Sequence, residues 1–511
     1  MIYAVVGGWL VLGAWVVTTW RKIATDHAWR TFTVLLVLAF SLLYQLLFAT
    51  VTEDALVSFR YAQNMADGAG PVFNPGDRYE GYANFLWLVV IALPRAAFGA
   101  EIQASAVVLG IVATLACVLL AYFLANRITR LALPEGAEPR PAVGVAAALL
   151  TAGASGLAVY GPSGTEQPMF VLLVLAVVYA FVARRPVVAG VLVAAAVMTR
   201  PEGLVLAVVT GLWLVAAAAR GRHTWWAPAG YVLGALVFLV PWTAWRVTYY
   251  GHFLPDSAVR VLGPDWSYLG GFSLTHLGFL VLGLVAVVAL ATVRTRGRGA
   301  HARSAVWLLV VLALCLTVFV AVLDGDSGPS WRLLVPVPPL LAVASVGAYG
   351  VLTSVPSPKP RTVSRLVPAV TAVVTGLAVL ASVVSPQVLT YVRAWHTDST
   401  QLAEVGEWLA TYLPPGSAVS AGAPGALAGR AGSQLFVFGL DVGWATLEVP
   451  ERGYARTQLC DDDQPPTYRV ATFKRTGTPF WIAVYPQADE ASALIAALDR
   501  APEFQYVSCP G

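Results

Sequence analysis

An acidic pair, Glu53-Asp54, opens the longest polar stretch between the apolar segments, residues 52–87, directly after the second of these segments. An ionised carboxylate can act as a general base, or it can stabilise positive charge that develops on a reacting carbon. A structural alternative stays open, because acidic side chains also stabilise the first turn of a helix. Apolar residues at helical spacing from 55 to 65 predict an interfacial amphipathic helix here, ending at Gly68.

Two arginines stand at the edges of other short polar stretches. Arg200 lies in a connection beside Glu202, and Arg332 ends the stretch 324–332. A guanidinium group can hold a phosphate through its planar fork of donors. Arg200 can equally pair with Glu202 or with a lipid headgroup, and the sequence leaves these alternatives open. The stretch 249–257 adds aromatic rings that can stack on a sugar or lie in the interfacial belt of a membrane.

The segment Asp324-Gly325-Asp326 raises the question of a metal ion. A hard divalent cation usually takes six or more oxygen ligands, so two carboxylates on one turn are weak support for a metal site. The pattern therefore favours a protein that needs no metal.

The composition requires a lipid environment for most of the chain. Of its 511 residues 58% are hydrophobic and 12% are charged, and the mean hydropathy is +0.70. The net charge of +4 is small and scattered, which excludes the clustered basic face that nucleic-acid binding needs. The first apolar run, 2–20, has no basic region before it and no clear cleavage site after it, so we expect a retained helix.

Segments of about 20 apolar residues can cross the hydrocarbon core as helices. The sequence predicts twelve spans, at 2–20, 31–51, 105–127, 142–160, 168–183, 186–199, 203–219, 225–247, 272–293, 304–323, 333–353 and 366–386. Two of these spans, 168–183 and 186–199, are short, which predicts that the helices tilt, that the bilayer thins locally or that the segments are partly re-entrant.

The connections between these spans differ strongly in charge from one side to the other. One alternate set holds 17 Lys and Arg against three acidic residues, and the other set holds seven against twelve. Basic connections face the cytoplasm, so both chain ends and the polar tail, 387–511, are predicted to lie outside. Cys460 and Cys509 lie in that tail, and two cysteines in one extracytoplasmic domain suit a disulfide.

The tail combines a helical pattern at 401–413 with strand-like runs at 417–420, 435–438 and 480–485. Turn signals separate these runs, which predicts a small α/β domain. The expected fold is an α-helical polytopic membrane protein with a transmembrane domain over 1–386, an outer loop at 52–104 and an extracytoplasmic α/β domain over 387–511.

These stretches together resemble the GT-C class of integral-membrane glycosyltransferases, and in particular the actinobacterial arabinofuranosyltransferases that add terminal residues to cell-wall arabinan. In that family the first outer loop opens with Asp-Asp and runs through Phe-Arg-Tyr-Ala-x-Asn to Glu-Gly-Tyr-x-Asn-Phe-Leu-Trp. The corresponding residues here are Glu53-Asp54, Phe59-Arg60-Tyr61-Ala62-Gln63-Asn64 and Glu80-Gly81-Tyr82-Ala83-Asn84-Phe85-Leu86-Trp87. Later motifs follow in the same order at 163–168, 199–203, 249–255 and 325–332. Glu53 departs from the family's Asp, and Asp256-Ser257 stands where Asn-Thr is common.

The resemblance implies roles for individual residues. It makes Asp54 the general base or the carboxylate that stabilises an oxocarbenium-like centre, with Glu53 assisting. Arg60, Arg200 and Arg332 become candidates for the donor phosphate, and the last two are preferred. The side chains that would position the sugar are those of Glu80, Tyr82, Asn84, Glu166, Glu202, Tyr249, His252 and Asp326.

The sequence therefore predicts a multi-pass plasma-membrane glycosyltransferase with its active site on the extracytoplasmic face. The resemblance implies transfer of arabinofuranose from decaprenylphosphoryl-arabinose, or a similar polyprenyl-phosphate sugar, to a cell-envelope glycan such as arabinogalactan or lipoarabinomannan. Membrane lipids are its other expected partners, and no cofactor is required.

Two other classes of protein are weaker alternatives. A transporter or flippase of a polyprenyl-linked sugar would place polar groups near the bilayer midplane, whereas here they collect at one surface. A scaffold whose tail binds other envelope proteins would leave the membrane motifs without a purpose.

Overall fold

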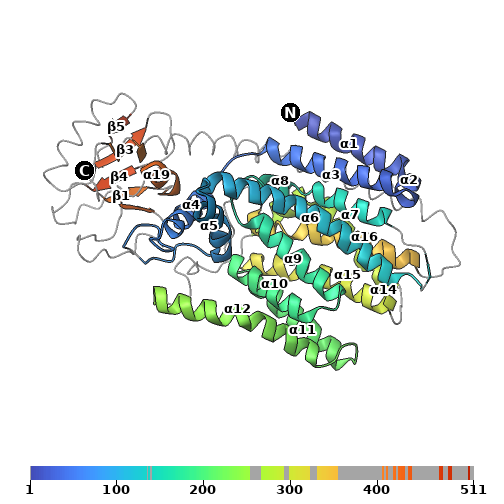
Figure 1. Ribbon diagram of the computed structural model, residues 1–511. Helices are drawn as coiled ribbons and strands as arrows, with labels where there is room; N and C mark the ends of the chain where they lie inside the picture. Colours follow the sequence, from blue (N-terminus) through green and yellow to red (C-terminus); the bar gives the residue numbers. More distant parts are fainter. Residues whose placement is uncertain are drawn as a thin grey trace.

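A computed structural model describes most of the first 354 residues and several short segments beyond them. The described residues are 2–76, 78–134, 136–137, 141–251, 253, 266–292, 298–322, 331–354, 406–407, 410–411, 418–421, 424–431, 436–439, 471–475, 482–485 and 504–506. Figure 1 shows a long body of helices with a small group of strands at one end.

The helices follow the apolar segments of the sequence. They are α1 (Ile2–Thr18), α2 (Trp20–Thr25), α3 (His27–Leu47), α4 (Glu53–Ala66), α5 (Phe85–Phe98), α6 (Ile102–Ala132), α7 (Ala142–Ala152), α8 (Ser155–Tyr160), α9 (Gln167–Val182), α10 (Pro186–Thr199), α11 (Gly203–Ala219), α12 (Trp226–Tyr250), α13 (Trp266–Thr275), α14 (Leu277–Thr292), α15 (Arg298–Val322), the 3-10 turn η2 (Arg332–Leu334), α16 (Val337–Ser354) and α19 (Pro424–Ala431). The predicted amphipathic helix is confirmed as α4, which ends just before Gly68.

Within the described ranges, the structure does not confirm the predicted count of twelve membrane spans. Five helices are long and apolar enough to cross a bilayer, His27–Leu47, Ile102–Ala132, Trp226–Tyr250, Gly299–Val322 and Arg332–Ser354. A sixth span is counted if α13 and α14, which meet at an angle of 78°, form one broken crossing. Helices α1, α9, α10 and α11 coincide with predicted spans, yet each has at most 17 residues. A multi-pass membrane protein is nevertheless the architecture that these helices define.

Two predicted spans differ from the expectation of one continuous helix over each range. Residues 142–160 form two helices, α7 and α8, because the chain leaves the helix at Gly153 and Ala154. The segment predicted at 272–293 begins earlier, at Trp266, and bends between α13 and α14. Both errors have one cause, since hydrophobicity sets the length of an apolar run but not where the helix breaks inside it. The predicted span 366–386 lies outside the described residues.

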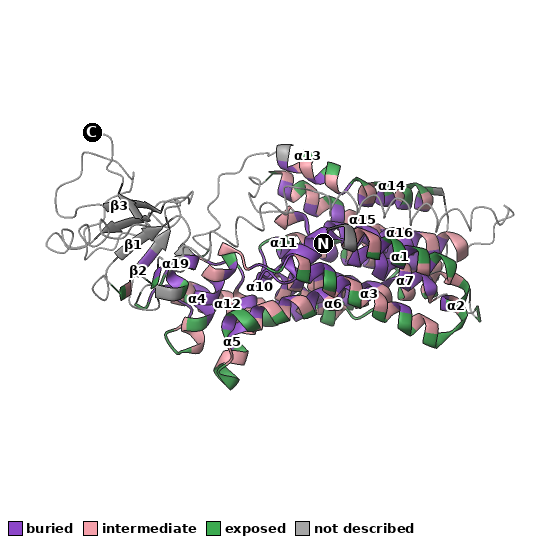
Figure 2. Ribbon diagram, turned by 90° about the horizontal axis from the view of Figure 1, so that it is seen from above, coloured by how far each residue is buried: buried purple, intermediate pink, exposed green. Residues whose placement is uncertain are grey.

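The centre of the helical body is α16, which is enclosed by its neighbours. It packs against α6, α7, α14 and α15, and most of its residues are buried, which Figure 2 shows in purple. In contrast, α12 exposes apolar side chains such as Leu233 and Val237 at the edge of the body. Exposed apolar residues on a spanning helix are suited to contact with lipid.

Close contact between α10 and α12 depends on two glycines. A Cβ atom at Gly190 would collide with the carbonyl oxygen of Tyr231, and one at Gly234 would collide with that of Val187. Small residues at such a crossing allow two backbones to approach closely in a membrane.

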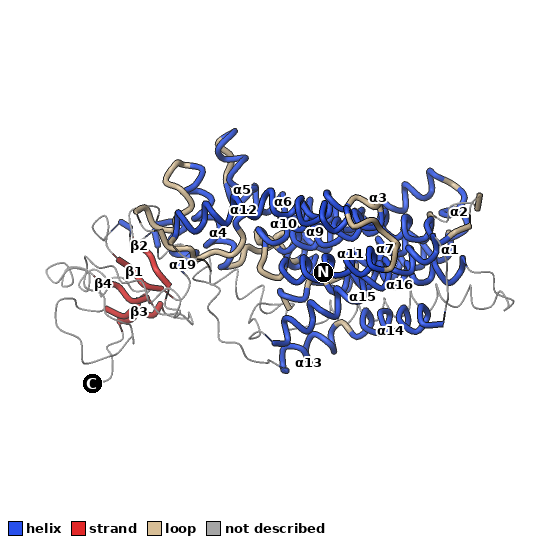
Figure 3. Tube along the Cα trace, turned by 90° about the horizontal axis from the view of Figure 1, so that it is seen from below, coloured by secondary structure: helices blue, strands red, loops and turns tan. Residues whose placement is uncertain are grey.

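The described strands in the tail form one mixed sheet. Its members are β1 (Ala418–Ala421), β2 (Phe436–Gly439), β3 (Ala471–Arg475), β4 (Ile482–Tyr485) and β5 (Phe504–Tyr506), in the order β2-β1-β4-β3-β5. Only β1 and β2 pair in parallel, with Val419 opposite Val437, and the other pairs are antiparallel. Figure 3 shows the strands in red beyond the helical body. The three predicted strand runs overlap β1, β2 and β4, while the division at residue 387 stays a prediction.

Candidate functional site

The predicted catalytic carboxylate contacts a predicted phosphate-binding arginine. Asp54 lies in the first turn of α4, and its Oδ2 forms a salt bridge with Nη1 of Arg332, at the start of η2. The Asp54 side chain is 61% exposed, whereas that of Arg332 is 15% exposed. Water screens such a pair, so it is worth at most about 1 kcal/mol. An incoming anion can therefore replace the carboxylate at Arg332 at small cost.

Arg200 forms a buried cluster with two carboxylates. Its Nη2 and Nε lie 2.7 Å and 3.1 Å from the two oxygens of Glu202, and its Nη1 lies 2.5 Å from Oε1 of Glu166. All three side chains are at most 11% exposed. The pairing with Glu202 that the sequence left open is therefore present. The assignment of Arg200 to a donor phosphate stays a prediction.

Asn84 connects this cluster to the helix that carries Asp54. Its Nδ2 lies 2.9 Å from Oε2 of Glu166 and 3.0 Å from Oγ of Ser58, and Ser58 Oγ donates to the backbone carbonyl of Asp54. The Asn84 Oδ1 atom is buried and has no hydrogen-bond partner within the described part of the chain. An unpaired buried acceptor costs about 1–3 kcal/mol, which a ligand hydroxyl at this position would recover.

The loop before α9 presents Glu166 because one glycine adopts a left-handed conformation. Gly164 has φ +80°, and a Cβ atom there would lie 2.5 Å from the ring of Phe59 on α4. Its carbonyl accepts the indole N–H of Trp87 at 2.9 Å. These contacts fix the loop against α4 and α5. They require glycine at position 164, because only glycine adopts this conformation without strain and leaves room for Phe59.

Glu80 and Tyr82 lie in a second buried network. Arg246 on α12 places its Nε 2.7 Å from Oε1 of Glu80, whose residue is 2% exposed. The hydroxyls of Tyr82 and Tyr250 are 2.9 Å apart, and Tyr250 also donates to the carbonyl of Pro71. Burial raises the pKa of Tyr82 well above its usual range, and the neighbouring Tyr250 and the negative charge of Glu80 add to the shift, so this phenol stays neutral. Arg246 was absent from the predicted site residues; its signal in the sequence was a charge near the end of the apolar run 225–247.

Glu53 holds the tail against α4. Its Oε1 accepts the backbone N–H of Gly425 and its Oε2 that of Ala426, at 3.0 Å, so the carboxylate caps the N-terminus of α19. Asn74 exchanges two hydrogen bonds with the backbone of Val437 in β2. These contacts could not be predicted from local patterns, because more than 360 residues separate the partners.

Arg60 also contacts this part of the tail. Its Nη1 donates to the carbonyl of Ala428 in α19 at 3.3 Å, and its Nε donates to that of Phe73 at 3.0 Å. Burial lowers the pKa of Arg60. The structure thus places two of the predicted site residues, Glu53 and Arg60, at the junction with α19, and their predicted chemical roles stay predictions.

Tyr249 is half-buried at the end of α12. Its ring stacks on that of Trp245 with 5.4 Å between centroids, and the Arg78 guanidinium lies 4.8 Å from the Tyr249 centroid. Four of the predicted residues, His252, Asp326, Cys460 and Cys509, lie outside the described residues. Within the described ranges, no group of three or more His, Cys, Asp or Glu side chains is placed to hold a metal ion.

Comparison with known proteins supports the resemblance that the motifs predicted. No family model matches the chain. The terminal beta-(1->2)-arabinofuranosyltransferase of Corynebacterium glutamicum is 26% identical over 353 residues, which are 58% of this chain and 48% of that protein. The chain thus spans about half the length of the curated relative that it matches.

The fold matches that of solved membrane-protein structures. ArnT from Cupriavidus metallidurans bound to undecaprenyl phosphate superposes with a TM-score of 0.56 at 15% identity, over 90% of this chain and 98% of ArnT. ArnT in the apo state gives a TM-score of 0.55 at 16% identity, over 89% and 98% of the two chains. The resemblance to GT-C glycosyltransferases is confirmed, and the fold of this chain is similar to that of ArnT. Within that class, the curated relative is a terminal arabinofuranosyltransferase.

Proposed function

We propose that this protein is a membrane glycosyltransferase that transfers arabinofuranose from a polyprenyl-phosphate donor to a cell-envelope glycan. The contact between Asp54 and Arg332 carries the proposal, because it joins a solvent-accessible carboxylate to a guanidinium group at one end of the helical body. The relative named as an arabinofuranosyltransferase supports the sugar, and the undecaprenyl phosphate bound to ArnT supports the lipid carrier.

The reaction needs one base and one group that accepts negative charge. The oxygen of the acceptor hydroxyl forms a bond to the anomeric carbon while the bond from that carbon to the phosphate oxygen breaks. Asp54 takes the acceptor proton, and Arg332 turns from Asp54 to the departing polyprenyl phosphate and neutralises its charge. The proposed mechanism uses no metal ion.

Neighbouring side chains orient the sugar in this proposal. The buried Oδ1 of Asn84 accepts a sugar hydroxyl, and the Glu166–Arg200–Glu202 cluster fixes Asn84 through its Nδ2. The cluster has one more carboxylate than guanidinium groups, which favours positive charge at the reacting carbon.

The extracytoplasmic placement of the site belongs to the same proposal. The connections at the Asp54 end of the helices belong to the acidic set, so the positive-inside rule puts this end outside. The charged clusters also lie at helix ends, since Glu166 precedes α9 and Arg200 follows α10. A transporter would place such groups near the middle of broken helices.

The direct test is an assay of the purified protein with a polyprenyl-phosphate arabinose donor and an arabinan acceptor. Asp54→Asn should lower turnover by about 100-fold or more, since a positioned base contributes at least that much. Asp67→Asn is the matched control, because Asp67 lies on the same outer stretch and also pairs with an arginine, Arg95, at 2.8 Å. Equal turnover of Asp54→Asn and the wild type, or movement of the lipid-linked sugar without a new glycosidic bond, would defeat the proposal.

A further inference from the structure

A cavity of about 620 Å³ lies between α11 and α15, away from the Asp54–Arg332 pair. Its volume is in the range of ligand sites, roughly 300–1,000 Å³. Helix α11 starts beside Glu202 and runs for 17 residues, about 25 Å, to Arg220 at one end of the cavity. The end of the cavity at Arg220 therefore lies at the opposite end of the helical body from the candidate active site.

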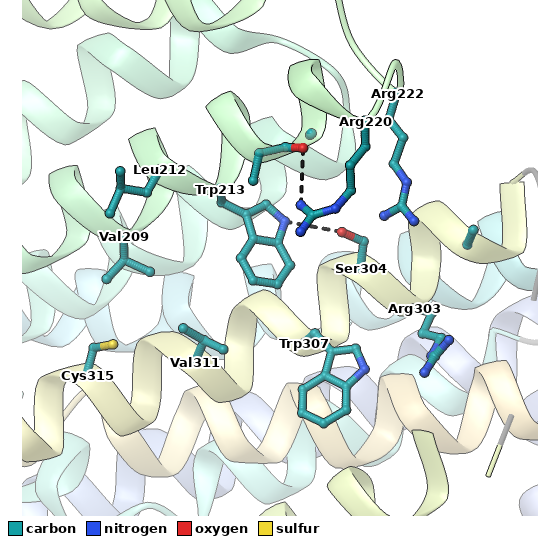
Figure 4. A pocket seen from close by; sticks show the side chains of 13 residues that line it. Val209, Leu212, Trp213, Arg220, Arg222, Arg303, Ser304, Trp307, Val311 and Cys315 are labelled. Atoms are coloured by element: carbon teal, nitrogen blue, oxygen red, sulfur yellow. Dashed lines mark hydrogen bonds between the residues drawn. The ribbon is translucent and has the colours of Figure 1, made fainter. Parts of the chain in front are cut away.

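One end of the cavity is basic. Arg220, Arg222 and Arg303 line it, and Figure 4 shows all three at the same end. None of the cavity's lining residues is acidic. The Nε of Arg303 is buried and has no hydrogen-bond partner among the residues that the structure describes. A buried donor of a charged group needs an acceptor, and an anion at this position would supply one.

The rest of the cavity is apolar and lies deeper between the helices. Val209 and Cys315 mark its far end in Figure 4, and the indoles of Trp213 and Trp307 separate that end from the arginines. Trp213 donates to Oγ of Ser304 at 3.2 Å, which holds its ring across the two helices. Tryptophan between a polar and an apolar zone is typical of the membrane interface.

The depth of the cavity matches one leaflet of a bilayer. From Arg303 to Cys315 the helix α15 rises about 18 Å, whereas the whole hydrocarbon core is about 30 Å thick. A ligand with its charge at the arginines and its chain along the cavity would thus stay within a single leaflet. This dimension suits a glycerophospholipid better than a long polyprenyl chain.

We infer that the cavity between α11 and α15 is a binding site for an anionic glycerophospholipid of the leaflet opposite the candidate active site. The three arginines hold the phosphate, and one acyl chain lies along Val209, Trp213 and Trp307 towards Cys315. Basic pockets between transmembrane helices recognise anionic headgroups by this combination of charge and apolar depth. The inference does not depend on the sugar-transfer reaction.

The test is native mass spectrometry of the delipidated full chain, titrated with phosphatidylglycerol or phosphatidylcholine. Wild-type protein should retain phosphatidylglycerol preferentially. The double variant Arg220→Gln/Arg303→Gln should weaken phosphatidylglycerol binding by about 25-fold, at roughly fivefold for each arginine. Phosphatidylcholine binding should weaken much less, because its choline cation offsets the charge of its phosphate. The matched control is Arg21→Gln/Arg130→Gln, which removes two exposed arginines from the same basic set of connections and should change binding less than twofold.

A second pair of variants tests the apolar part without altering charge. Val311→Trp fills the cavity and should displace the phospholipid, whereas Leu314→Trp changes a 60% exposed side chain on the same helix, outside the lining, and should not. Equal retention of both lipids by the wild type would overturn the inference. So would equal losses in cavity and control variants, or displacement of phosphatidylglycerol from the cavity by an equimolar polyprenyl phosphate.

Discussion

Replacing Arg200 with Gln leaves the carboxylates of Glu166 and Glu202 buried without their cation. In the native cluster the guanidinium makes three hydrogen bonds to these two side chains, which are 11% and 5% exposed. Removing one partner of a buried ion pair costs about 3–5 kcal/mol, because the remaining charge loses its compensation in a medium of low dielectric constant. We expect the free energy of unfolding of Arg200→Gln to fall by about that amount.

A second variant separates the effect of the uncompensated charges on the free energy of unfolding from the effect of altered side-chain packing. The triple variant Arg200→Gln/Glu166→Gln/Glu202→Gln removes all three charges, so most of the lost stability should return. The assay is unfolding by SDS titration in mixed micelles, with the free energy of unfolding of each variant compared with that of the wild type. A change below about 1 kcal/mol for Arg200→Gln, or a triple variant that is less stable than the single one, would refute the buried-cluster reasoning.

Two more predictions concern the elements around Asp54. Glu53→Ala should loosen α19, because it removes both acceptors from the helix N-terminus, and hydrogen exchange over residues 424–431 should accelerate by about tenfold. The exposed Glu101→Ala should leave that exchange unchanged, and protection of α19 in Glu53→Ala would contradict the capping role. Gly164→Ala should lower the free energy of unfolding by at least about 1 kcal/mol, since φ is +80° and the new methyl group meets Phe59. SDS titration should show this loss, and equal stability would mean that the loop is not fixed as described.

The helices were predictable because their signals are local. Apolar runs marked most of the spans, and helical spacing after Glu53-Asp54 predicted the helix that the structure shows as α4. The length of the helices was predicted less well. Helices α9, α10 and α11 have 16, 14 and 17 residues, fewer than the about 20 that usually cross the hydrocarbon core. Breaks inside apolar runs, as between α7 and α8, have no hydrophobic signal.

The contacts between distant segments were the part that the sequence could not supply. Asp54 and Arg332 were each selected on chemical grounds, but their pairing depends on how η2 meets α4. Glu53 was selected for the same chemistry, and only the fold shows that its carboxylate caps α19. Arg246 lay at the end of an apolar run, and its role became visible with the partner Glu80.

The proposed sugar transfer requires Asp54 and Arg332 to act together. The most direct measurement is a double-mutant cycle on turnover, with Asp54→Asn, Arg332→Gln and the double variant assayed on the same donor and acceptor. Residues that act as one unit give strongly non-additive losses, so the double variant should be no slower than the slower single variant. Losses that simply multiply, or a single variant with wild-type turnover, would contradict the account.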